Sequence, residues 1–355
     1  MRRAKRSSRS SGSWRSWAGS AAPWVAAAML VAASLVAAAA SPAAGADSRF
    51  APVPGPYAVE AMNLDWFDRD RNRQVPVRVY FPRHEPGPFP VVVFSSGLGA
   101  GRNNFEFLGR HLASHGYVSV HVQHLGSDGQ VEKGGADARG ALRQAARDPR
   151  TGLTRLLDLV FALDQVGALA TGSPVLRGRI DLGAVAVGGN NLGAWTALAA
   201  AGLAMVGKDG EESSLPDPRV KAALLFFPPP AAAQGGRMRF EHVKVPCLHV
   251  VGAPAGGHEN DAQAAARRIA FDQIAGADQV LVTVITAAGA PAGASAGAGA
   301  PGPDRAKAMP GYLKAISTAF LDVYLRHDAA AKSWLAGGGL AAYLGDGGRV
   351  ETRSK

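Results

Sequence analysis

The sequence predicts an α/β fold in which helices cover both faces of one mostly parallel sheet that has an antiparallel N-terminal edge. Segments of strand character alternate with segments of helical spacing along most of the chain, the order that builds parallel sheets. Phe89–Phe94 is a continuous apolar run, as expected for a central strand buried on both faces. Val185–Ala199 changes from alternating to helical spacing at a glycine-rich corner, which indicates a strand, a sharp turn and a helix.

The first two predicted strands, Tyr57–Trp66 and Val75–Phe81, alternate between apolar and polar residues and are separated by a turn near Asp68–Asn72. They are expected to form the antiparallel edge. The remaining predicted strands are, in chain order, Phe89–Phe94, Tyr117–Val122, Ile180–Val187, Val220–Phe227, Val245–Val251 and Gln279–Ile285.

Apolar residues at helical spacing lie between these strands. One of the predicted helices contains Pro149 and is expected to be interrupted there. Composition predicts loops over the polar Lys208–Pro218 and over Ala287–Pro303, which consists almost entirely of Ala, Gly and Pro. The helices are predicted over Phe105–His115, Arg139–Val166, the residues after Asn191, Ala262–Ile274 and Tyr312–Leu325.

The chain of 355 residues is long enough for one large domain preceded by an N-terminal extension. Residues 1–46 have the layout of a secretory signal peptide: a basic start, an apolar run over Trp24–Ala40, and a small-x-small motif at Ala44–Ala46. Residues 47–345 are predicted to be the folded domain and 346–355 a C-terminal tail. This organisation predicts a secreted, periplasmic or envelope protein. An uncleaved signal would instead make the segment a membrane anchor.

Composition and charge exclude several classes of protein. The 47% apolar content supports a large core, and the 19% charged content is too low for a disordered chain. The net charge is +10, but six of the positive charges lie in residues 1–46, so +4 remains from Asp47 onward. Without a basic cluster interleaved with aromatic residues, nucleic-acid binding is not expected. The single cysteine, Cys247, excludes an internal disulfide and is predicted to be an inert buried thiol.

The glycine-rich corner has the spacing of the nucleophile elbow of serine hydrolases, Gly-x-Ser-x-Gly. Gly189 and Gly193 occupy the glycine positions, and Asn191 stands where the serine would be. An amide is a poor nucleophile that a neighbouring base does not activate. Asparagine does tolerate a positive φ. We therefore predict that the backbone corner forms around Asn191 without its nucleophile.

Five segments carry a resemblance to a known family: Val75–Tyr80, Ser96–Gly99, Leu112–Tyr117, His121–Asp128 and Ala319–Leu325. They resemble the bacterial predicted dienelactone hydrolases, which are α/β-hydrolases related to the platelet-activating-factor acetylhydrolases. The resemblance extends from about Tyr57 to Leu344. It implies an α/β-hydrolase fold for nearly the whole mature chain and a serine-esterase type of active site built from Ser, Asp and His in that order.

The resemblance also implies that all three triad residues are lost. The serine position is Asn191. After the strand that precedes the acid, Gly252–Gly256 replaces the family pattern Gly-Thr-x-Asp-Asp and puts Ala255 at the aspartate position. After the last predicted strand, Gly289–Ala292 replaces Gly-x-Asp-His and puts Ala292 at the histidine position. Attack, proton transfer and orientation of the base would then all be missing.

Two backbone N–H groups of an oxyanion hole are implied by the same resemblance. One belongs to Leu192, after the elbow residue, and the other to Leu98, in the loop after the third strand. Because they belong to the backbone, both are expected to outlast the triad. The family histidine that precedes the loop glycine is replaced by Ser96.

The remaining polar candidates are interpreted mainly as structural. The serines Ser95, Ser96 and Ser295 are interpreted as turn residues because no base is assigned to them. In the cluster His258–Asp261, a side chain is expected to cap the next helix, although a rescuing histidine at His258 is an alternative.

His121 and His124 flank a strand end and are candidates to line the pocket implied by the resemblance. They have no cysteine or carboxylate at ligand spacing, so no metal is predicted. No cofactor is predicted either. Trp195 is expected to pack against its helix rather than against a ligand.

These observations lead to one main hypothesis, an exported pseudohydrolase that binds a small ester, a lipid or a protein partner. The first alternative is a carboxylic-ester hydrolase with a relocated nucleophile, such as Ser96 assisted by His258 or His124. The second is an envelope scaffold held by an uncleaved N-terminal anchor. Fold resemblance alone does not distinguish their ligands.

Overall fold

The computed structural model describes residues 50–129, 138–207, 210–231, 237–254, 261–286 and 303–355. Residues 46–355 form one compact unit, and all the described residues belong to it. The predicted signal segment lies outside the described residues. None of the described helices combines the length and the apolar character needed to cross a bilayer.

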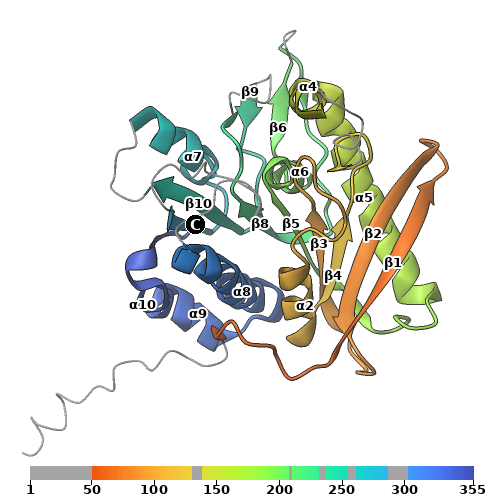
Figure 1. The fold of residues 1–355 in the computed structure, drawn as a ribbon, viewed down its shortest axis with the longest axis horizontal. Helices are drawn as coiled ribbons and strands as arrows, with labels where there is room; N and C mark the ends of the chain where they lie inside the picture. The colour runs from red at the N-terminus through yellow and green to blue at the C-terminus, as the bar shows by residue number, and fades with distance from the viewer. Residues whose placement is uncertain (1–49, 130–137, 208–209, 232–236, 255–260, 287–302) are drawn as a thin grey trace, which may run out of the picture. The chain divides into compact units, whose positions relative to one another are not determined.

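The described residues contain a nine-stranded sheet in the order β1-β2-β4-β3-β5-β8-β10-β11-β12 (Figure 1). The strands from β4 to β11 in this order are parallel, whereas β1 with β2, β2 with β4, and β11 with β12 are antiparallel. The predicted sheet and its antiparallel N-terminal edge are confirmed. The strands are β1 (Val59–Asp68), β2 (Arg73–Pro82), β3 (Phe89–Ser95), β4 (Val118–Val122), β5 (Ile180–Asn190), β8 (Val220–Phe226), β10 (Cys247–Pro254), β11 (Gln279–Thr286) and β12 (Gly348–Arg353).

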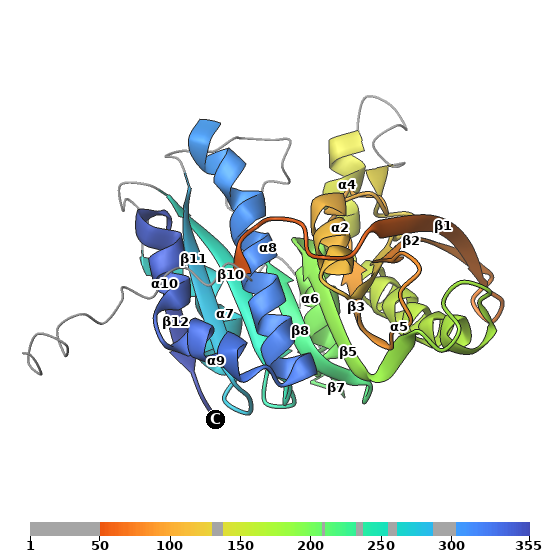
Figure 2. The same cartoon turned by 90° about the horizontal axis from the view of Figure 1, so that it is seen from below.

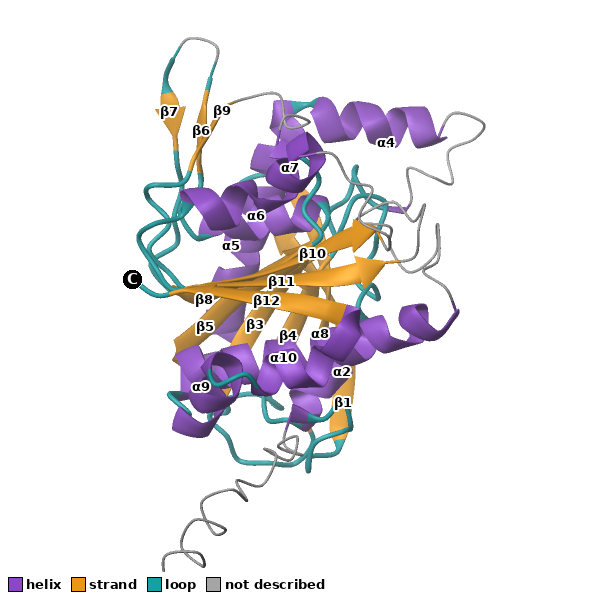
Figure 3. Ribbon diagram, turned by 90° about the vertical axis from the view of Figure 1, so that its left-hand side faces the viewer, coloured by secondary structure: helices purple, strands orange, loops and turns teal. Residues whose placement is uncertain are grey.

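Helices cover both faces of this sheet, as Figure 3 shows from its edge. One face carries α4 (Ala138–Arg147), α5 (Pro149–Gly172), α6 (Leu192–Ala200) and α7 (Asp261–Gln273). The other carries α2 (Glu106–Ser114), α8 (Pro303–Arg326), α9 (Ala329–Ala336) and α10 (Gly339–Leu344), followed by a 3₁₀ turn, η3 (Gly345–Gly347). Figure 2 shows α8 lying along β8 and β10.

The interruption predicted near Pro149 is confirmed, because it separates α4 from α5. Asp148 is the N-cap of α5, and its carboxylate accepts a hydrogen bond from the N–H of Arg150 at 2.9 Å. Pro149 is the first helical residue, where its fixed φ fits and its missing N–H has no consequence.

The central strand β3 shows how the sheet is held between the two helical layers. All seven of its residues are buried. Val91 and Val93 pack in the core cluster that includes residues of α5 and α6, whereas Val92 and Phe94 pack in the cluster that includes residues of α2 and α8. This alternation places Ser95, the last residue of β3, on the α5 and α6 side.

The C-terminal residues differ from the predicted tail, because Gly348–Arg353 form the edge strand β12. Their sequence, Gly-Arg-Val-Glu-Thr-Arg, has one strongly apolar residue and therefore gives no strand-like apolar pattern. The strand is held instead by its pairing with β11 and by a hydrogen bond of 2.9 Å that Arg353 donates to the Phe271 carbonyl. Charged side chains are common on such edges.

A second, three-stranded sheet, which the sequence did not predict, lies after α6. Its strands are β6 (Ala204–Val206), β7 (Glu212–Ser213) and β9 (Arg237–Arg239). They are two or three residues long, too short for a periodic pattern, and β7 lies within the segment predicted to be a polar loop.

Candidate functional site

The corner between β5 and α6 has the backbone conformation of a nucleophile elbow. Asn191 has φ 53° and ψ −126°, a strained combination that non-glycine residues rarely adopt. Its N–H donates to the Phe226 carbonyl at 2.9 Å, which ties the corner to the end of β8. The structure therefore contains the predicted corner, with a partly exposed asparagine at its tip.

Both glycines of the motif are required by close backbone contacts. A Cβ at Gly189 would lie 2.2 Å from the carbonyl oxygen of Gly193. At Gly193, a Cβ would lie 2.1 Å from the carbonyl oxygen of Ser95. Carbon and oxygen atoms in ordinary van der Waals contact are more than 1 Å farther apart. The elbow motif is therefore a packing requirement, whatever residue occupies its centre.

The Leu192 N–H, expected to be an available oxyanion donor, has an acceptor in this structure. Asn191 Oδ1 accepts its hydrogen bond at 2.7 Å. Asparagine side chains commonly bond to nearby backbone groups in this way. Leu98 lies in the loop that packs beside the elbow, because a Cβ on its neighbour Gly97 would lie 3.3 Å from the Cβ of Asn191. The role of Leu98 N–H as an oxyanion donor stays a prediction.

Aromatic side chains form an apolar surface next to the elbow. The ring of Phe105 lies 5.2 Å from that of Phe107 and 6.0 Å from that of Phe226, measured between centroids. Phe105, Phe107 and Phe227 are partly exposed. The loop that holds Phe105 is joined to the elbow strand, because Asn104 Nδ2 donates to Asn190 Oδ1 at 3.3 Å. These partly exposed rings therefore lie on segments that are hydrogen-bonded to the elbow strand or follow the end of β8.

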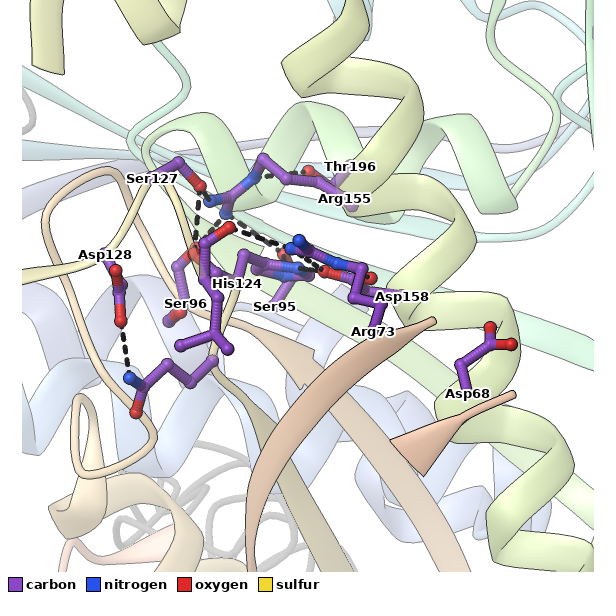
Figure 4. Close-up of polar contacts among 12 residues, drawn as sticks. Asp68, Arg73, Ser95, Ser96, His124, Ser127, Asp128, Arg155, Asp158 and Thr196 are labelled. Atoms are coloured by element: carbon purple, nitrogen blue, oxygen red, sulfur yellow. Dashed lines mark hydrogen bonds and ion pairs between the residues drawn. The ribbon is translucent and has the colours of Figure 1, made fainter. Parts of the chain in front are cut away.

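On the α5 side of β3, three residues form a chain with the connectivity of a Ser-His-Asp triad (Figure 4). Ser95 Oγ lies 2.8 Å from His124 Nε2, and His124 Nδ1 lies 3.1 Å from Asp158 Oδ2. Ser95 ends β3, His124 follows β4, and Asp158 lies on α5. An ionised Asp158 can only accept, so His124 Nδ1 donates to it and Nε2 accepts from the Ser95 hydroxyl. This is the tautomer that a catalytic triad uses.

Burial distinguishes these three hydrogen-bonded residues from a catalytic triad. Ser95 and His124 have no exposed surface, and neither has the side chain of Asp158. Burial lowers the pKa of His124 to about 4, so the imidazole is neutral at physiological pH. A substrate carbonyl has no access to the Ser95 hydroxyl in this conformation. The arrangement therefore supplies structural hydrogen bonds rather than an accessible nucleophile.

Asp158 is the centre of a buried charge network. Arg71 Nη1 lies 2.8 Å from its Oδ1, and Arg73 binds both of its oxygens, at 2.7 and 2.9 Å. Burial by itself would raise the pKa of Asp158, but the hydrogen bonds from His124 and Arg73 outweigh it and lower the pKa. The carboxylate therefore stays ionised and anchors the β1–β2 hairpin to α5.

Arg155, one turn away from Asp158 on α5, extends the network to α6. It is 1% exposed, and its guanidinium donates to Ser127 Oγ at 2.8 Å, to Thr196 Oγ1 at 3.3 Å and to the carbonyl of Ser96. Burial lowers its pKa to about 9, which still leaves it charged at neutral pH. The network thus joins α5 to α6 and to the loops after β3 and β4.

Sequence reasoning missed Arg155 and Asp158, although a signal was present. Both lie on the same face of α5 as the buried Leu156, Leu159 and Leu163. Charged residues on an apolar helix face indicate buried charged groups that need polar partners elsewhere in the fold. Ser95 was interpreted only as a turn residue.

The relocated pair of Ser96 and His124 is not brought together. Ser96 is 2% exposed and its hydroxyl donates to the Ala100 carbonyl at 3.3 Å, whereas His124 binds Ser95. His121 faces the opposite helical layer, where its Nδ1 lies 2.9 Å from the Asn104 carbonyl. Within the described ranges, His, Cys, Asp and Glu residues form no group arranged to hold a metal ion.

Two structural interpretations are confirmed. Trp195 is 6% exposed and its Nε1 donates to the Pro229 carbonyl at 2.9 Å. Cys247 is fully buried, and burial raises the pKa of its thiol to about 12, which keeps it in the neutral thiol form at physiological pH. The positions assigned to the acid and the histidine, Ala255 and Ala292, lie outside the described residues, as do His258 and Ser295.

Four buried histidines make stability sensitive to acid. Burial lowers the pKa of His111 to about 3 and the pKa values of His121, His124 and His249 to about 4 each. An unfolded histidine has a pKa of about 6.5, so the unfolded chain binds more protons than the folded one below that pH. Stability is therefore complete above about pH 6.5 and is lost as the pH falls toward 4. Urea unfolding at a series of pH values should show a falling midpoint, and an equal midpoint at pH 7 and 5 would contradict this.

Residues 71–131 match the sequence profile of the family described as platelet-activating factor acetylhydrolase, isoform II. The match spans β2, β3, α2 and β4 and includes His124 and Ser127, but it ends before α5 and the elbow. Comparison of the chain with curated proteins finds no match. The profile match and the helix-covered sheet together support an α/β-hydrolase fold of the acetylhydrolase or esterase type.

Proposed function

We propose that this protein is an exported, catalytically inactive α/β-hydrolase-fold protein that binds a small ester or lipid beside its elbow. The observation that carries the proposal is Asn191. It occupies the strained tip, and its own amide oxygen accepts the N–H of Leu192. The attacking atom is thus replaced and one oxyanion donor is already bonded. Export is inferred from the signal-like composition of residues 1–46.

The proposed ligand follows from the chemistry around Asn191. The partly exposed rings of Phe105, Phe107 and Phe227 offer contacts to an acyl or aromatic group. The Asn191 amide Nδ2 has no hydrogen-bond partner among the described residues and can donate to an ester carbonyl. Ground-state binding of this kind needs no nucleophile or base.

A second candidate function is ester hydrolysis by the buried residues Ser95, His124 and Asp158, because their hydrogen bonds have the connectivity of a triad. This function requires an opening of the α5 side of the sheet that would expose the Ser95 hydroxyl. Two observations weigh against it: the three side chains have no exposed surface, and Asp158 is already bound by two arginines.

Turnover of p-nitrophenyl butyrate separates the two candidates. We expect hydrolysis at the rate of buffer alone for the full-length protein and for Asn191→Ser, because a serine at the elbow still lacks the aspartate and histidine replaced by Ala255 and Ala292. A rate above buffer that Ser95→Ala abolishes would instead establish hydrolysis through the buried chain. Labelling of Ser95 by a fluorophosphonate would support the same conclusion.

Binding is tested with the non-hydrolysed amide analogue, 4-nitrobutyranilide, by equilibrium dialysis. Phe105→Ala should weaken binding at least several-fold because it removes a ring next to the elbow. Phe67→Ala removes an exposed ring from β1 and should leave binding unchanged, so it is the matched control. Equal effects of the two substitutions, or no saturable binding by the unmodified protein, would reject the proposed site.

A further inference from the structure

We infer that Asn191 is a site of self-deamidation, at which the elbow backbone promotes conversion of the amide to a carboxylate. The inference concerns a covalent modification and does not depend on the proposed function. It starts from the backbone angle ψ of Asn191, which is −126°. In an L residue the Cβ lies roughly 120° from the amide nitrogen around the Cα–C bond. The nitrogen of the next residue, Leu192, is therefore nearly eclipsed with Cβ of Asn191.

This eclipsed arrangement is the one that ring closure needs. A succinimide ring contains the Leu192 nitrogen together with C, Cα, Cβ and Cγ of Asn191, and a planar five-membered ring requires a torsion near zero around Cα–C. In helices ψ is about −42° and in strands about +135°, so regular structure holds the nitrogen away from Cβ. The strained elbow, unlike a helix or a strand, already has the ψ angle that ring closure needs.

The hydrogen bond between the two groups places the reacting atoms side by side. Leu192 N lies 2.7 Å from Asn191 Oδ1, and Oδ1 is bonded to Cγ, the carbon that would be attacked. Leu192 is the first residue of α6, so its N–H donates no hydrogen bond to a helix carbonyl. Its deprotonation therefore breaks no helical hydrogen bond. The positive end of the α6 dipole stabilises both the deprotonated nitrogen and the carboxylate product. Asn191 is partly exposed, so water reaches the site.

The reaction balances without an oxidant or a cofactor. The Leu192 nitrogen loses its proton and forms a bond to Cγ of Asn191, the Cγ–Nδ2 bond breaks, and Nδ2 leaves as ammonia with the added proton. Water then opens the succinimide. Attack at Cγ yields aspartate at position 191, and attack at the backbone carbonyl yields isoaspartate. Either product carries a carboxylate in place of the amide and is about 1 Da heavier.

The neighbouring asparagine provides an internal control. Asn190 lies at the end of β5 with 4% of its surface exposed, and its Oδ1 accepts from Asn104 Nδ2. The nitrogen that would attack it belongs to Asn191, and that N–H donates to the Phe226 carbonyl. Two adjacent asparagines thus differ in backbone conformation, hydrogen bonding and exposure.

The test measures the rate of mass increase at each asparagine by peptide mapping. The full-length protein is incubated at mildly alkaline pH in ¹⁸O-labelled water, either folded or in concentrated urea. Leu192 hinders ring closure in a flexible chain by its bulk, so the unfolded rate at Asn191 should be low. Because the elbow holds the reacting groups together, we expect the folded rate at Asn191 to exceed the unfolded rate about tenfold or more.

The proposal also requires Asn190 to remain unmodified over the same period in the folded protein. Asn191→Gln keeps the amide but needs a six-membered ring, so it should show no mass change at position 191. A folded rate at Asn191 equal to or below the rate in urea would overturn the proposal. Mass is measured rather than turnover, so this result is independent of whether the protein hydrolyses or binds esters.

Discussion

Replacing Asp158 by alanine is expected to lower the free energy of unfolding by about 3–5 kcal/mol. The substitution removes the carboxylate that pairs with Arg71 and Arg73 and that accepts the hydrogen bond of His124. The His124 Nδ1–H would then be left without its acceptor in a site that has no exposed surface. Urea unfolding followed by far-ultraviolet circular dichroism measures the change.

The matched control is Asp65→Ala, which breaks an ion pair that is largely exposed. Asp65 lies 2.7 Å from Arg102, but its side chain is 62% exposed. Exposed pairs contribute about 0–1 kcal/mol, so this variant should unfold close to the unmodified protein. If both substitutions destabilise equally, the network around Asp158 does not hold the hairpin to α5, and the structural role assigned to it is wrong.

Replacing Gly193 by alanine is expected to destabilise the protein by about 3 kcal/mol or more, at the upper end of the range for overpacking. The new methyl group would lie 2.1 Å from the carbonyl oxygen of Ser95, and both atoms are fixed by backbone. Either β3 or the start of α6 must move. The same urea titration measures this loss of stability. Movement of either segment should also relax the strained ψ of Asn191.

Gly167→Ala in α5 is the matched control, because it places the same methyl group in open space. A Cβ there meets no atom within 4 Å. Alanine is the better helix former, so this variant should be more stable by about 0.5–1 kcal/mol. A neutral or stabilising effect of Gly193→Ala would mean that the elbow packs more loosely than the structure shows.

The fold and the site depend on different parts of the sequence. The apolar periodicity that predicts strands and helices is carried by core residues such as Val91 and Val93, which pack against α5 and α6. The elbow is carried by Gly189 and Gly193, whose spacing alone indicates a sharp corner. That asparagine and not serine stands at the centre of this corner follows from the sequence alone, because it needs only the identity of one residue at a position fixed by the motif.

The buried network could not be predicted in the same way. Ser95, His124 and Asp158 come from β3, from the loop after β4 and from α5, and 63 positions of sequence separate Ser95 from Asp158. Arg155 and Asp158 show local signals of burial on α5, but nothing in their spacing names their partners. The edge strand β12 was missed for a related reason, since its identity depends on pairing with β11.

The sequence by itself determined the alternation of strands and helices, the glycine corner and the amide at its tip, because each depends on residues close together in the chain. Only the tertiary structure decided that the Leu192 N–H bonds to Asn191 and that Ser95, His124 and Asp158 form a buried chain. The physical reason is that hydrogen-bond partners and burial depend on the packing of segments distant in sequence, and on a strained backbone angle that the contacts around the corner hold in place.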